Sequence, residues 1–345
     1  MPLLNIKSLT IEELVAQLAQ LGLKKYRAAQ IFEWIKDRHV SVFDDMTNIS
    51  KSERELLGKS FSLTYPPILK TEISSDGTRK FLFALEDRHT IESVLIPGED
   101  RMTLCISSQV GCQQACRFCV TGKNGFIRDL IFYEIVDQVA EVSNVLRQEG
   151  AGKITNIVLM GMGEPLANYK EVLKAVRVIT APKGLGFSPR RITLSTAGLV
   201  PEIGELGASG VKVNLAISLN ATTDTVRDEI MPVNKRYPLQ MLLAACKHYP
   251  LEPRRRITFE YVLLKDVNDS PEDAVRLARL LRGIKSKVNL IPYNPSPESA
   301  FLRPDDRVVR KFQQVLLDHD YTAPIRESRG RDISAACGQL REKSL

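Results

Sequence analysis

The sequence lacks the features of a membrane or secreted protein. It contains no run of about 18 or more apolar residues, the length that a membrane-spanning helix needs. Its N-terminus, MPLLNIKSLTIEEL, lacks the basic segment followed by an apolar segment that is typical of a signal peptide. We therefore expect a cytoplasmic location and no membrane partner. Histidine is also scarce, and the four in the chain lie far from the cysteine-rich stretch, which disfavours a mixed Cys/His zinc site.

The composition is that of a globular protein. Apolar residues form 43% and charged residues 26% of the 345-residue chain, so it can bury a large core and hold one α/β domain with a small appendage. A net charge of +7 permits a polyanionic partner without requiring one. In a chain expected in the cytosol, six cysteines indicate metal binding or catalysis more than a disulfide framework.

The first 65 residues are predicted to form a small helical accessory domain. Ser8 or Thr10 can cap a first helix through IEELVAQLAQLG, and two further helices are expected in KKYRAAQIFEWIKDR and SKSERELLGKSF. The second helix is basic, with Lys24, Lys25 and Arg27 near its start. Those charges indicate either a solvated face, which spacing alone favours, or an RNA-binding surface.

Residues 66–100 alternate apolar and polar side chains, which predicts a short antiparallel β section with a hairpin turn at Asp76-Gly77. Strands then alternate with amphipathic helices over 101–325, which is typical of a parallel sheet covered by helices. The fold class is therefore α/β, and we expect an open, partial (β/α)6 barrel because six units exceed half of an eight-unit barrel. A final helix and a strand in APIRES precede a tail at 326–345. The six strands are expected at 103–107, 154–160, 192–195, 211–218, 257–264 and 288–291.

The cysteines at 112, 116 and 119 follow a C-x3-C-x2-C pattern. Three thiolates on one loop can hold a four-iron cluster and leave one iron open for an outside ligand such as S-adenosylmethionine (SAM). Zinc remains a rival, with Cys105 as its fourth ligand, but Cys105 lies in a predicted strand and paired C-x2-C motifs are missing. Cys246 is expected in the core, whereas Cys337 is either a buried structural residue or, given its glycine-rich tail, a reactive thiol.

The carboxyl ends of the predicted strands carry small and polar residues, and in parallel β/α folds function gathers at these ends. Glycines let the backbone approach a ligand closely, and a carboxylate can bind the ammonium group of an amino acid. Hydroxyl and amide groups suit a ribose and a carboxylate. The residues concerned are Gly161, Gly163, Glu164, Ser195, Ser218, Leu219, Asn220 and Asn294.

These motifs together resemble the radical SAM RNA methyltransferases that methylate carbon 2 of adenine. The resemblance rests on the cysteine loop, MGMGEPLAN, LSTAG, SLN, VNLIPYNP and DISAACGQL, and it covers nearly the whole chain. The best-known members act on adenine 2503 of 23S rRNA and adenine 37 of tRNA. Carbon 2 of adenine is electron-poor and cannot attack a methyl group, so radical chemistry is needed.

The resemblance implies a role for each site residue. Cys112, Cys116 and Cys119 hold one [4Fe–4S] cluster. Cys337 accepts a methyl group from a first SAM, and a radical from a second SAM activates that group for addition to the base. Cys105 then resolves the protein–RNA adduct by a transient disulfide with Cys337. The SAM pocket is implied to contain Gly163, Glu164, Ser195, Ser218, Leu219, Asn220 and Asn294.

Glu92, in the segment HTIESV, matches the general base that removes the carbon-2 proton in the resembled family. From the residues alone, Glu92 is predicted to be a solvated strand residue. The resemblance further implies 23S rRNA and tRNA as partners, and we expect a reducing electron donor such as flavodoxin and a monomeric protein.

Two departures from the family pattern bear on the reaction. Asn220 stands where many relatives have His, and Val120-Thr121-Gly122 after the cluster is closer to a sister enzyme that methylates carbon 8 and confers antibiotic resistance. Pro165 and the IES segment favour the carbon-2 branch. A non-catalytic, zinc-stabilised RNA-binding module is the alternative from another class, since basic pairs such as Arg190-Arg191 lie in predicted loops.

Overall fold

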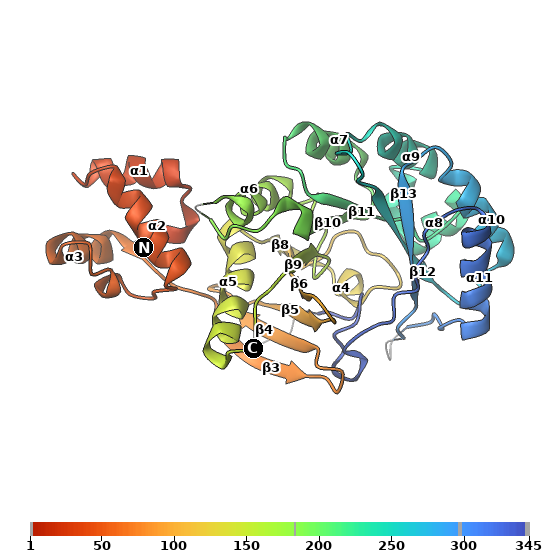
Figure 1. Cartoon of the computed structure of the whole chain (residues 1–345), viewed down its shortest axis with the longest axis horizontal. Coiled ribbons are helices and arrows are strands. Elements are labelled where there is room, and N and C mark those ends of the chain that lie inside the picture. Colours follow the sequence, from red (N-terminus) through yellow and green to blue (C-terminus); the bar gives the residue numbers. More distant parts are fainter. Residues whose placement is uncertain (1–2, 183, 296–298, 342–345) are drawn as a thin grey trace. The chain divides into compact units, whose positions relative to one another are not determined.

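The computed structural model describes residues 3–182, 184–295 and 299–341, apart from the side chains of 36 and 37. The chain forms two compact units (Figure 1). The first comprises Met1–Pro67, Ile131–Lys153 and Glu171–Ser188, and the second Ile68–Leu130, Ile154–Lys170 and Pro189–Leu345. None of the described helices has both the length and the apolar character to cross a lipid bilayer.

The first unit is built on the three predicted N-terminal helices. Thr10 caps the first of them in a capping box with Glu13, and Ser50 caps the third in the same way with Glu53, so both predicted starts are confirmed. Leu14 and Leu18 of the first helix are fully buried in the apolar core. The elements are β1 (Leu4–Asn5), η1 (Ile6–Ser8), α1 (Ile11–Gln20), α2 (Tyr26–Asp37), η2 (Phe43–Asp45), α3 (Lys51–Ser60), β2 (Phe61–Ser62), α5 (Phe132–Glu149) and α6 (Tyr169–Thr180).

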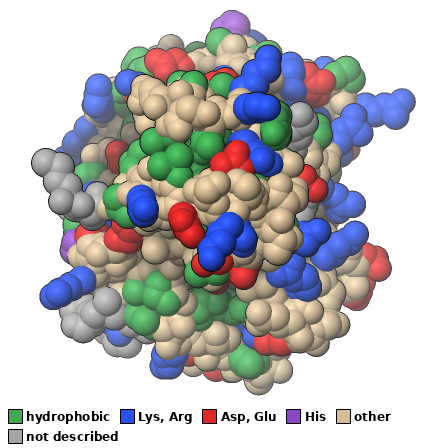
Figure 2. All heavy atoms as spheres, turned by 90° about the vertical axis from the view of Figure 1, so that its left-hand side faces the viewer, with side chains coloured by type: hydrophobic (Ala, Val, Ile, Leu, Met, Phe, Trp, Pro, Cys, Tyr) green, Lys and Arg blue, Asp and Glu red, His purple; other side chains and the backbone are tan. Residues whose placement is uncertain are grey.

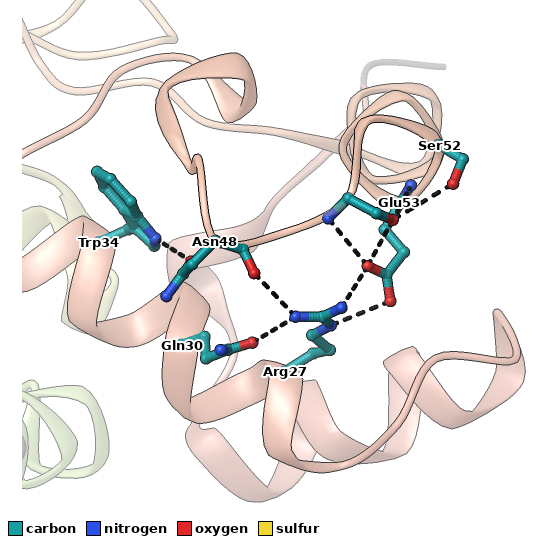
Figure 3. A network of polar contacts seen from close by, with 7 residues as sticks. Arg27, Gln30, Trp34, Asn48, Ser52 and Glu53 are labelled. Carbon is teal, nitrogen blue, oxygen red and sulfur yellow. Dashed lines mark hydrogen bonds and ion pairs between the residues drawn. The ribbon is translucent and has the colours of Figure 1, made fainter.

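Arg27 is not part of a freely solvated basic face. Its guanidinium on α2 donates to both carboxylate oxygens of Glu53 on α3, at 3.0 and 2.6 Å, and to the Asn48 carbonyl (Figure 3). Trp34 of α2 donates its indole N–H to the Asn48 side chain at 2.6 Å. This bidentate pair joins α2 to α3, so the solvated-face reading of the second helix is wrong at Arg27.

Lys7 forms the most deeply buried ion pair of the first unit. Its ammonium group binds the Asp137 carboxylate of α5, and both side chains are less than 5% exposed, at 4% and 3%. The same nitrogen lies 3.5 Å from the ring centroid of Tyr65. A buried charge persists only with such partners, so the pair ties the start of the chain to α5.

Nine of the described strands form one sheet in the second unit, in the order β13-β12-β11-β10-β9-β6-β5-β4-β3. The six strands from β6 to β13 in this list are mutually parallel, which confirms the predicted partial barrel, and β3, β4 and β5 add an antiparallel section joined by the predicted turn at Asp76-Gly77. The strands are β3 (Ile68–Ile73), β4 (Arg79–Ala84), β5 (Thr90–Pro97), β6 (Met102–Cys105), β9 (Asn156–Leu159), β10 (Ile192–Thr196), β11 (Asn214–Ser218), β12 (Ile257–Leu263) and β13 (Ser286–Pro292).

Helices on the outer side of the parallel strands complete the second unit (Figure 1). Tyr261 of β12 stacks on Phe312 of α11, with ring centroids 5.3 Å apart, which shows how the outer face of the sheet is covered. These helices are α7 (Val200–Ala208), α9 (Leu239–His248), α10 (Pro271–Leu280) and α11 (Asp306–Asp318). The other described helices of the unit are the short elements α4 (Val120–Lys123), η3 (Pro189–Arg191), α8 (Asp224–Ile230), η4 (Pro232–Lys235) and η5 (Arg331–Ile333).

Two local predictions need correction. The strand predicted in APIRES reduces to a single bridge between Ile325 and Leu290, because the segment pairs with β13 over too short a length. A hairpin that the sequence did not reveal, β7 (Gln109–Gly111) with β8 (Phe126–Asp129), flanks the cysteine loop. The hairpin was missed because its strands are short and its turn contains the whole cysteine motif.

The strand register divides the sheet into two faces. Ser195 pairs with Ala216, Ser218 with Glu260, and Glu260 with Asn289, so these side chains share one face. The alternate positions, such as Leu194, Ile217, Phe259 and Leu290, are apolar and almost fully buried. The polar face is therefore the inner, concave face of the barrel, where a site can form.

Candidate active site

The cysteine loop begins directly after β7, the short strand that follows the first parallel strand, β6. Its start is fixed by Cys112, whose backbone N–H donates to the Gly125 carbonyl at 2.7 Å, and its end by Cys119, which donates to the Cys116 carbonyl at 3.0 Å. Burial raises the pKa of the Cys112 thiol to about 12. Burial, followed by the charges of Cys119 and Cys112, raises the pKa of Cys116 well above its usual value. The three thiols therefore lie close enough to repel one another when ionised.

In the described part of the chain, no three His, Cys, Asp or Glu side chains surround a point that could hold one metal ion. Each of the six cysteines is a free thiol. Cys246 on α9 is 2% exposed, as predicted for a core residue.

Glu164 lies at the carboxyl end of β9, where the sequence predicted a ligand-binding loop. Its carboxylate accepts the backbone N–H groups of Leu166 at 3.0 Å and Ala197 at 2.6 Å. These hydrogen bonds lower the pKa of the carboxyl group, but burial has the larger effect and raises that pKa to about 7. The Thr196 side chain donates a further hydrogen bond to this carboxylate. A carboxylate has about four lone-pair sites, so with three bonds accepted the group can still accept one from an ammonium group.

Gln109 anchors this loop, a role that sequence reasoning missed. Its side-chain oxygen accepts the Glu164 N–H at 2.8 Å, and its side-chain nitrogen donates to Asp129 at 2.7 Å. Gly163 has φ +104°, and a Cβ there would lie 2.6 Å from the Gln109 Cβ. A glycine is thus required for β7 to pack against the loop.

Two strand-end asparagines differ in how their side chains are used. Asn220 is 1% exposed with φ +57°, and its amide binds the Val262 N–H at 2.8 Å and the Met231 sulfur at 3.2 Å. Asn294 is 5% exposed, and no hydrogen-bond donor among the described residues reaches its buried Oδ1. A buried acceptor that the protein leaves without a donor is a position where a bound ligand can supply one.

Arg227 of α8 connects the strand ends and was not recognised from the sequence. It is fully buried and donates to the carbonyls of Ala197 at 2.6 Å and Leu219 at 3.0 Å, and to the Asn234 side chain at 2.9 Å. Burial lowers its pKa to about 10, and the largest opposing charge is that of Cys116. The cation therefore lies within electrostatic reach of the cysteine loop.

The C-terminal tail is docked on the cysteine loop by backbone atoms. Val120 donates its N–H to the Gly338 carbonyl at 2.7 Å, and the Thr121 hydroxyl donates to the Leu340 carbonyl at 2.5 Å. Cys337, directly before the first anchor, is exposed, although protein atoms crowd its thiol enough to raise the pKa to about 12. The charge of Cys337 also raises the pKa of Cys105, after burial. The structure thus brings together two cysteines that lie far apart in the sequence.

Glu92 of β5 is fully buried, so the prediction of a solvated strand residue is wrong. Its carboxylate binds Lys80 at 3.3 Å and accepts the Arg341 N–H of the tail at 3.0 Å. Val94, two residues further on, pairs with Cys105, so Glu92 and Cys105 share the inner face. The sequence showed alternation in this strand but not that a tail covers its polar side.

The site fits a bound SAM and an iron–sulfur cluster. The Asn294 Oδ1 is an acceptor without a donor among the described residues, and the cysteine loop offers three free thiols. Hydroxyl groups of Ser195 and Ser218 stand on the same inner face as Cys105. Soft thiolates beside a polar pocket are the donor set that such a pair requires.

Comparisons with known proteins identify the family of the chain. Residues 106–278 match the model of the radical SAM superfamily, and residues 4–63 match that of the ribosomal RNA large subunit methyltransferase N-terminal domain. Proteins named dual-specificity RNA methyltransferase RlmN are 52% identical in Syntrophus aciditrophicus, over 99% of this chain and 97% of that protein, and 54% identical in Geotalea uraniireducens, over 98% and 96%.

A solved structure is similar over the same length. The crystal structure of a radical SAM methyltransferase from Sphaerobacter thermophilus superimposes with a TM-score of 0.93 and 45% identity, over 98% of this chain and 99% of that one. The two relatives named above are more than 50% identical to nearly the full chain, so the similarity includes the N-terminal helices and the tail as well as the barrel. The chain therefore belongs to the family of dual-specificity RNA methyltransferases within the radical SAM superfamily.

Proposed function

We propose that the protein methylates carbon 2 of adenine in RNA, at adenine 2503 of 23S rRNA and adenine 37 of tRNA. The observation that carries the proposal is the meeting of Cys105, Cys337 and the cysteine loop at one end of the barrel. The relatives are named dual-specificity RNA methyltransferases, which supports RNA as the substrate, and the match to the N-terminal domain of a ribosomal RNA methyltransferase supports ribosomal RNA as one target. Two thiols beside one cluster loop are what a reaction with a covalent protein–RNA intermediate requires.

In this proposal Cys112, Cys116 and Cys119 hold one [4Fe–4S] cluster. The SAM pocket is formed by residues at the strand ends, namely Gly163, Glu164, Ser195, Ser218, Leu219, Asn220 and Asn294. Asn220 contributes to this pocket through its buried backbone and amide. When bound, SAM and the cluster supply a methyl group and the radical chemistry that activates it, with two SAM consumed per product. Cys337 carries the methyl group and bonds through it to the base.

Glu92 and Cys105 complete the reaction from the inner face. Glu92 accepts the proton of carbon 2, and its place beside Lys80 and the tail keeps the carboxylate fixed there. Cys105 attacks the sulfur of Cys337, so that an S–S bond forms as the sulfur–carbon bond to the product breaks. The electron pair of that bond stays on carbon, which takes up the proton that Cys105 loses and becomes the methyl group. An outside reductant then reduces the disulfide.

The remaining partners follow from the same proposal. RNA binding is supported by the net charge of +7 and by the Lys and Arg side chains spread over the face in Figure 2, where Asp, Glu and apolar groups lie between them. We further propose a cytoplasmic monomer that receives electrons from a donor such as flavodoxin. The proposed domains are RNA-binding helices at 1–65, a β extension at 66–100, the barrel at 101–325, and the methyl-carrying tail at 326–345, of which 342–345 lie outside the described residues.

Nucleoside analysis tests the reaction. The reconstituted protein is incubated anaerobically with SAM, reductant and either 23S rRNA or tRNA, and the RNA is digested and analysed by mass spectrometry. We expect 2-methyladenosine from both RNAs. Finding 8-methyladenosine instead would reject the carbon-2 assignment, and a colourless preparation containing zinc would reject the reaction as a whole.

Trapping of the intermediate tests the cysteine roles. The Cys105→Ala variant should accumulate protein cross-linked to RNA, because the adduct on Cys337 is no longer resolved. The matched control is Cys246→Ala, a buried thiol on α9 that the proposal does not use. Normal turnover of Cys105→Ala without an adduct would show that Cys105 has another role.

A further inference from the structure

Four charged side chains of alternating sign form a row across the antiparallel section of the sheet, where β3, β4 and β5 lie side by side (Figure 1). This charged row consists of Lys70 and Glu72 of β3, Lys80 of β4 and Glu92 of β5. Its three ion pairs have nitrogen–oxygen distances of 2.9, 3.2 and 3.3 Å in that order. The proposed reaction uses Glu92 as a base and gives no chemical step to the other three.

The pairing of the strands places the charged row on the inner face. Glu72 pairs directly with Lys80, and Leu82, two residues beyond Lys80, pairs with Glu92. Side chains two residues apart in a strand share a face, and diagonal neighbours on adjacent strands lie within reach of long side chains. Glu72, Lys80 and Glu92 therefore point to the same side of the sheet, the side that also carries Cys105.

Exposure to solvent falls along the charged row. The side chains of Lys70 and Glu72 are 57% and 25% exposed, whereas those of Lys80 and Glu92 are 4% and 1% exposed. The tail also covers Glu92, because the Arg341 N–H donates to its Oε2 at 3.0 Å. A proton that Glu92 takes up must therefore leave through groups that are packed against it.

Stability alone does not account for a buried ammonium group at Lys80. Its nitrogen lies between two carboxylates, 3.2 Å from the Glu72 Oε2 and 3.3 Å from the Glu92 Oε1. Burying charges is costly, and apolar residues of similar volume often stabilise a core as well as a buried ion pair does. The arrangement instead links a buried base to a carboxylate that reaches water.

We propose that Lys80 and Glu72 form the route by which the proton collected by Glu92 leaves to solvent. The inference rests on the proposed function, in which Glu92 accepts the proton of carbon 2. Once that proton is bound, Glu92 is neutral and faces the Lys80 ammonium group. Lys80 passes one of its protons to the Glu72 carboxylate and takes up the proton of Glu92 in the same step. Glu72 then releases a proton to water, so all three groups regain their charges.

Infrared spectroscopy after a pH jump tests this route in the full-length protein, without SAM or RNA. A light-activated acid carries the pH across the range in which equilibrium spectra show Glu92 to titrate. Growth of the carboxylic acid band of Glu92, assigned by its loss in Glu92→Gln, gives the rate of proton uptake. A proton route works in both directions, so uptake should be about 10²-fold slower in Lys80→Arg and in Glu72→Gln, as expected for loss of a positioned proton-transfer group.

These two variants separate proton transfer from charge and packing. Arginine keeps a positive charge between the two carboxylates, but its guanidinium group does not give up a proton in a protein. Glutamine keeps an oxygen that can accept a hydrogen bond from Lys80, but this amide cannot take up the proton. A purely structural role of the charged row would leave the rate of proton uptake at Glu92 unchanged in both variants.

Lys70→Met is the matched control, because it removes the exposed end of the charged row and leaves the three groups of the route in place. Its rate should equal that of the unmodified chain. Glu72→Ala provides a rescue experiment, since it opens space at the partly exposed end where formate can supply a carboxylate. Added formate should restore fast uptake in Glu72→Ala and should have no effect in Lys80→Arg.

The proposal requires both Lys80 and Glu72. Normal uptake in either Lys80→Arg or Glu72→Gln would overturn it, and so would an equal slowing in Lys70→Met. The proposed function is tested separately by nucleoside analysis of Glu92→Gln. If that variant formed 2-methyladenosine at the normal rate, Glu92 would not be the base, while the infrared rates would still decide whether the route to Glu92 exists.

Discussion

Replacing Arg227 by Met should destabilise the barrel by about 4 kcal/mol. The guanidinium donates to the carbonyls of Ala197 and Leu219, which directly follow β10 and β11, and to the side chain of Asn234. A longer bond, at 3.2 Å, reaches the less deeply buried Ser218 carbonyl. The Leu219 carbonyl stays hydrogen-bonded in the variant, because the N–H of Ala221 also donates to it at 2.8 Å. The buried Ala197 carbonyl and Asn234 side chain lose this partner, at about 1–3 kcal/mol each.

The magnitude is large against the stability of a typical domain, about 5–15 kcal/mol. We would measure it by urea denaturation of the cluster-free protein, comparing Arg227→Met with Arg117→Met. Arg117 is half exposed and paired with Glu229, an arrangement worth about 0–1 kcal/mol. Met is chosen because it fills similar volume without adding a charge.

The outcome also bears on the cysteine loop. The Arg117 backbone N–H donates to the Ile230 carbonyl at the end of α8, so the helix that carries Arg227 also supports the loop. A shift below about 1 kcal/mol for Arg227→Met would refute the reasoning, since it would mean that the strand-end carbonyls find other donors at little cost.

Three further outcomes are expected. Lys7→Met should cost about 3–5 kcal/mol in denaturation experiments because Asp137 loses its buried cation, and adding Asp137→Leu should restore most of it; an unchanged Lys7→Met midpoint contradicts this. Gly163→Ala should weaken SAM binding in calorimetry by at least about tenfold, since its Cβ meets Gln109; equal affinity argues against the packing role. Asn294→Leu should keep or raise the stability of the cofactor-free protein by up to about 1 kcal/mol, because an unsatisfied acceptor is removed, yet weaken SAM binding; a stability loss contradicts that account.

The architecture could be predicted because strand periodicity and strand ends are local properties. Two-residue alternation located β4 and β5, and the apolar strands of the barrel were each found within a few residues of their observed ends. The small residues that close them, from Gly163 to Asn294, fall at the carboxyl edge because parallel strands require it. The hairpin of β7 and β8 escaped because the cysteine motif lengthens its turn beyond any common turn pattern.

Charged residues on the inner face were harder to interpret. Glu92 and Glu260 both lie in alternating or apolar strands, where a carboxylate normally marks the solvent side. Their burial depends on the curvature of the sheet and on the tail that crosses it, neither of which a strand pattern contains. Arg227 was overlooked for the same reason, since its partners are backbone carbonyls of distant strands.

The sequence singled out Cys337 as a possible reactive thiol, but side-chain types alone did not predict where its tail docks. Its neighbours are held through main-chain carbonyls, those of Gly338 and Leu340, and the main-chain N–H of Arg341. Main-chain hydrogen bonds of this kind do not depend on which side chains the segment carries, so the sequence did not show that the tail docks on the barrel. The side chains that determine the docking lie on the barrel. The Thr121 hydroxyl and the Glu92 carboxylate are buried polar groups, and each has a hydrogen-bond partner in the tail. Because those groups lie on the cysteine loop and on β5, the fold of the barrel determines where the distant thiol is placed.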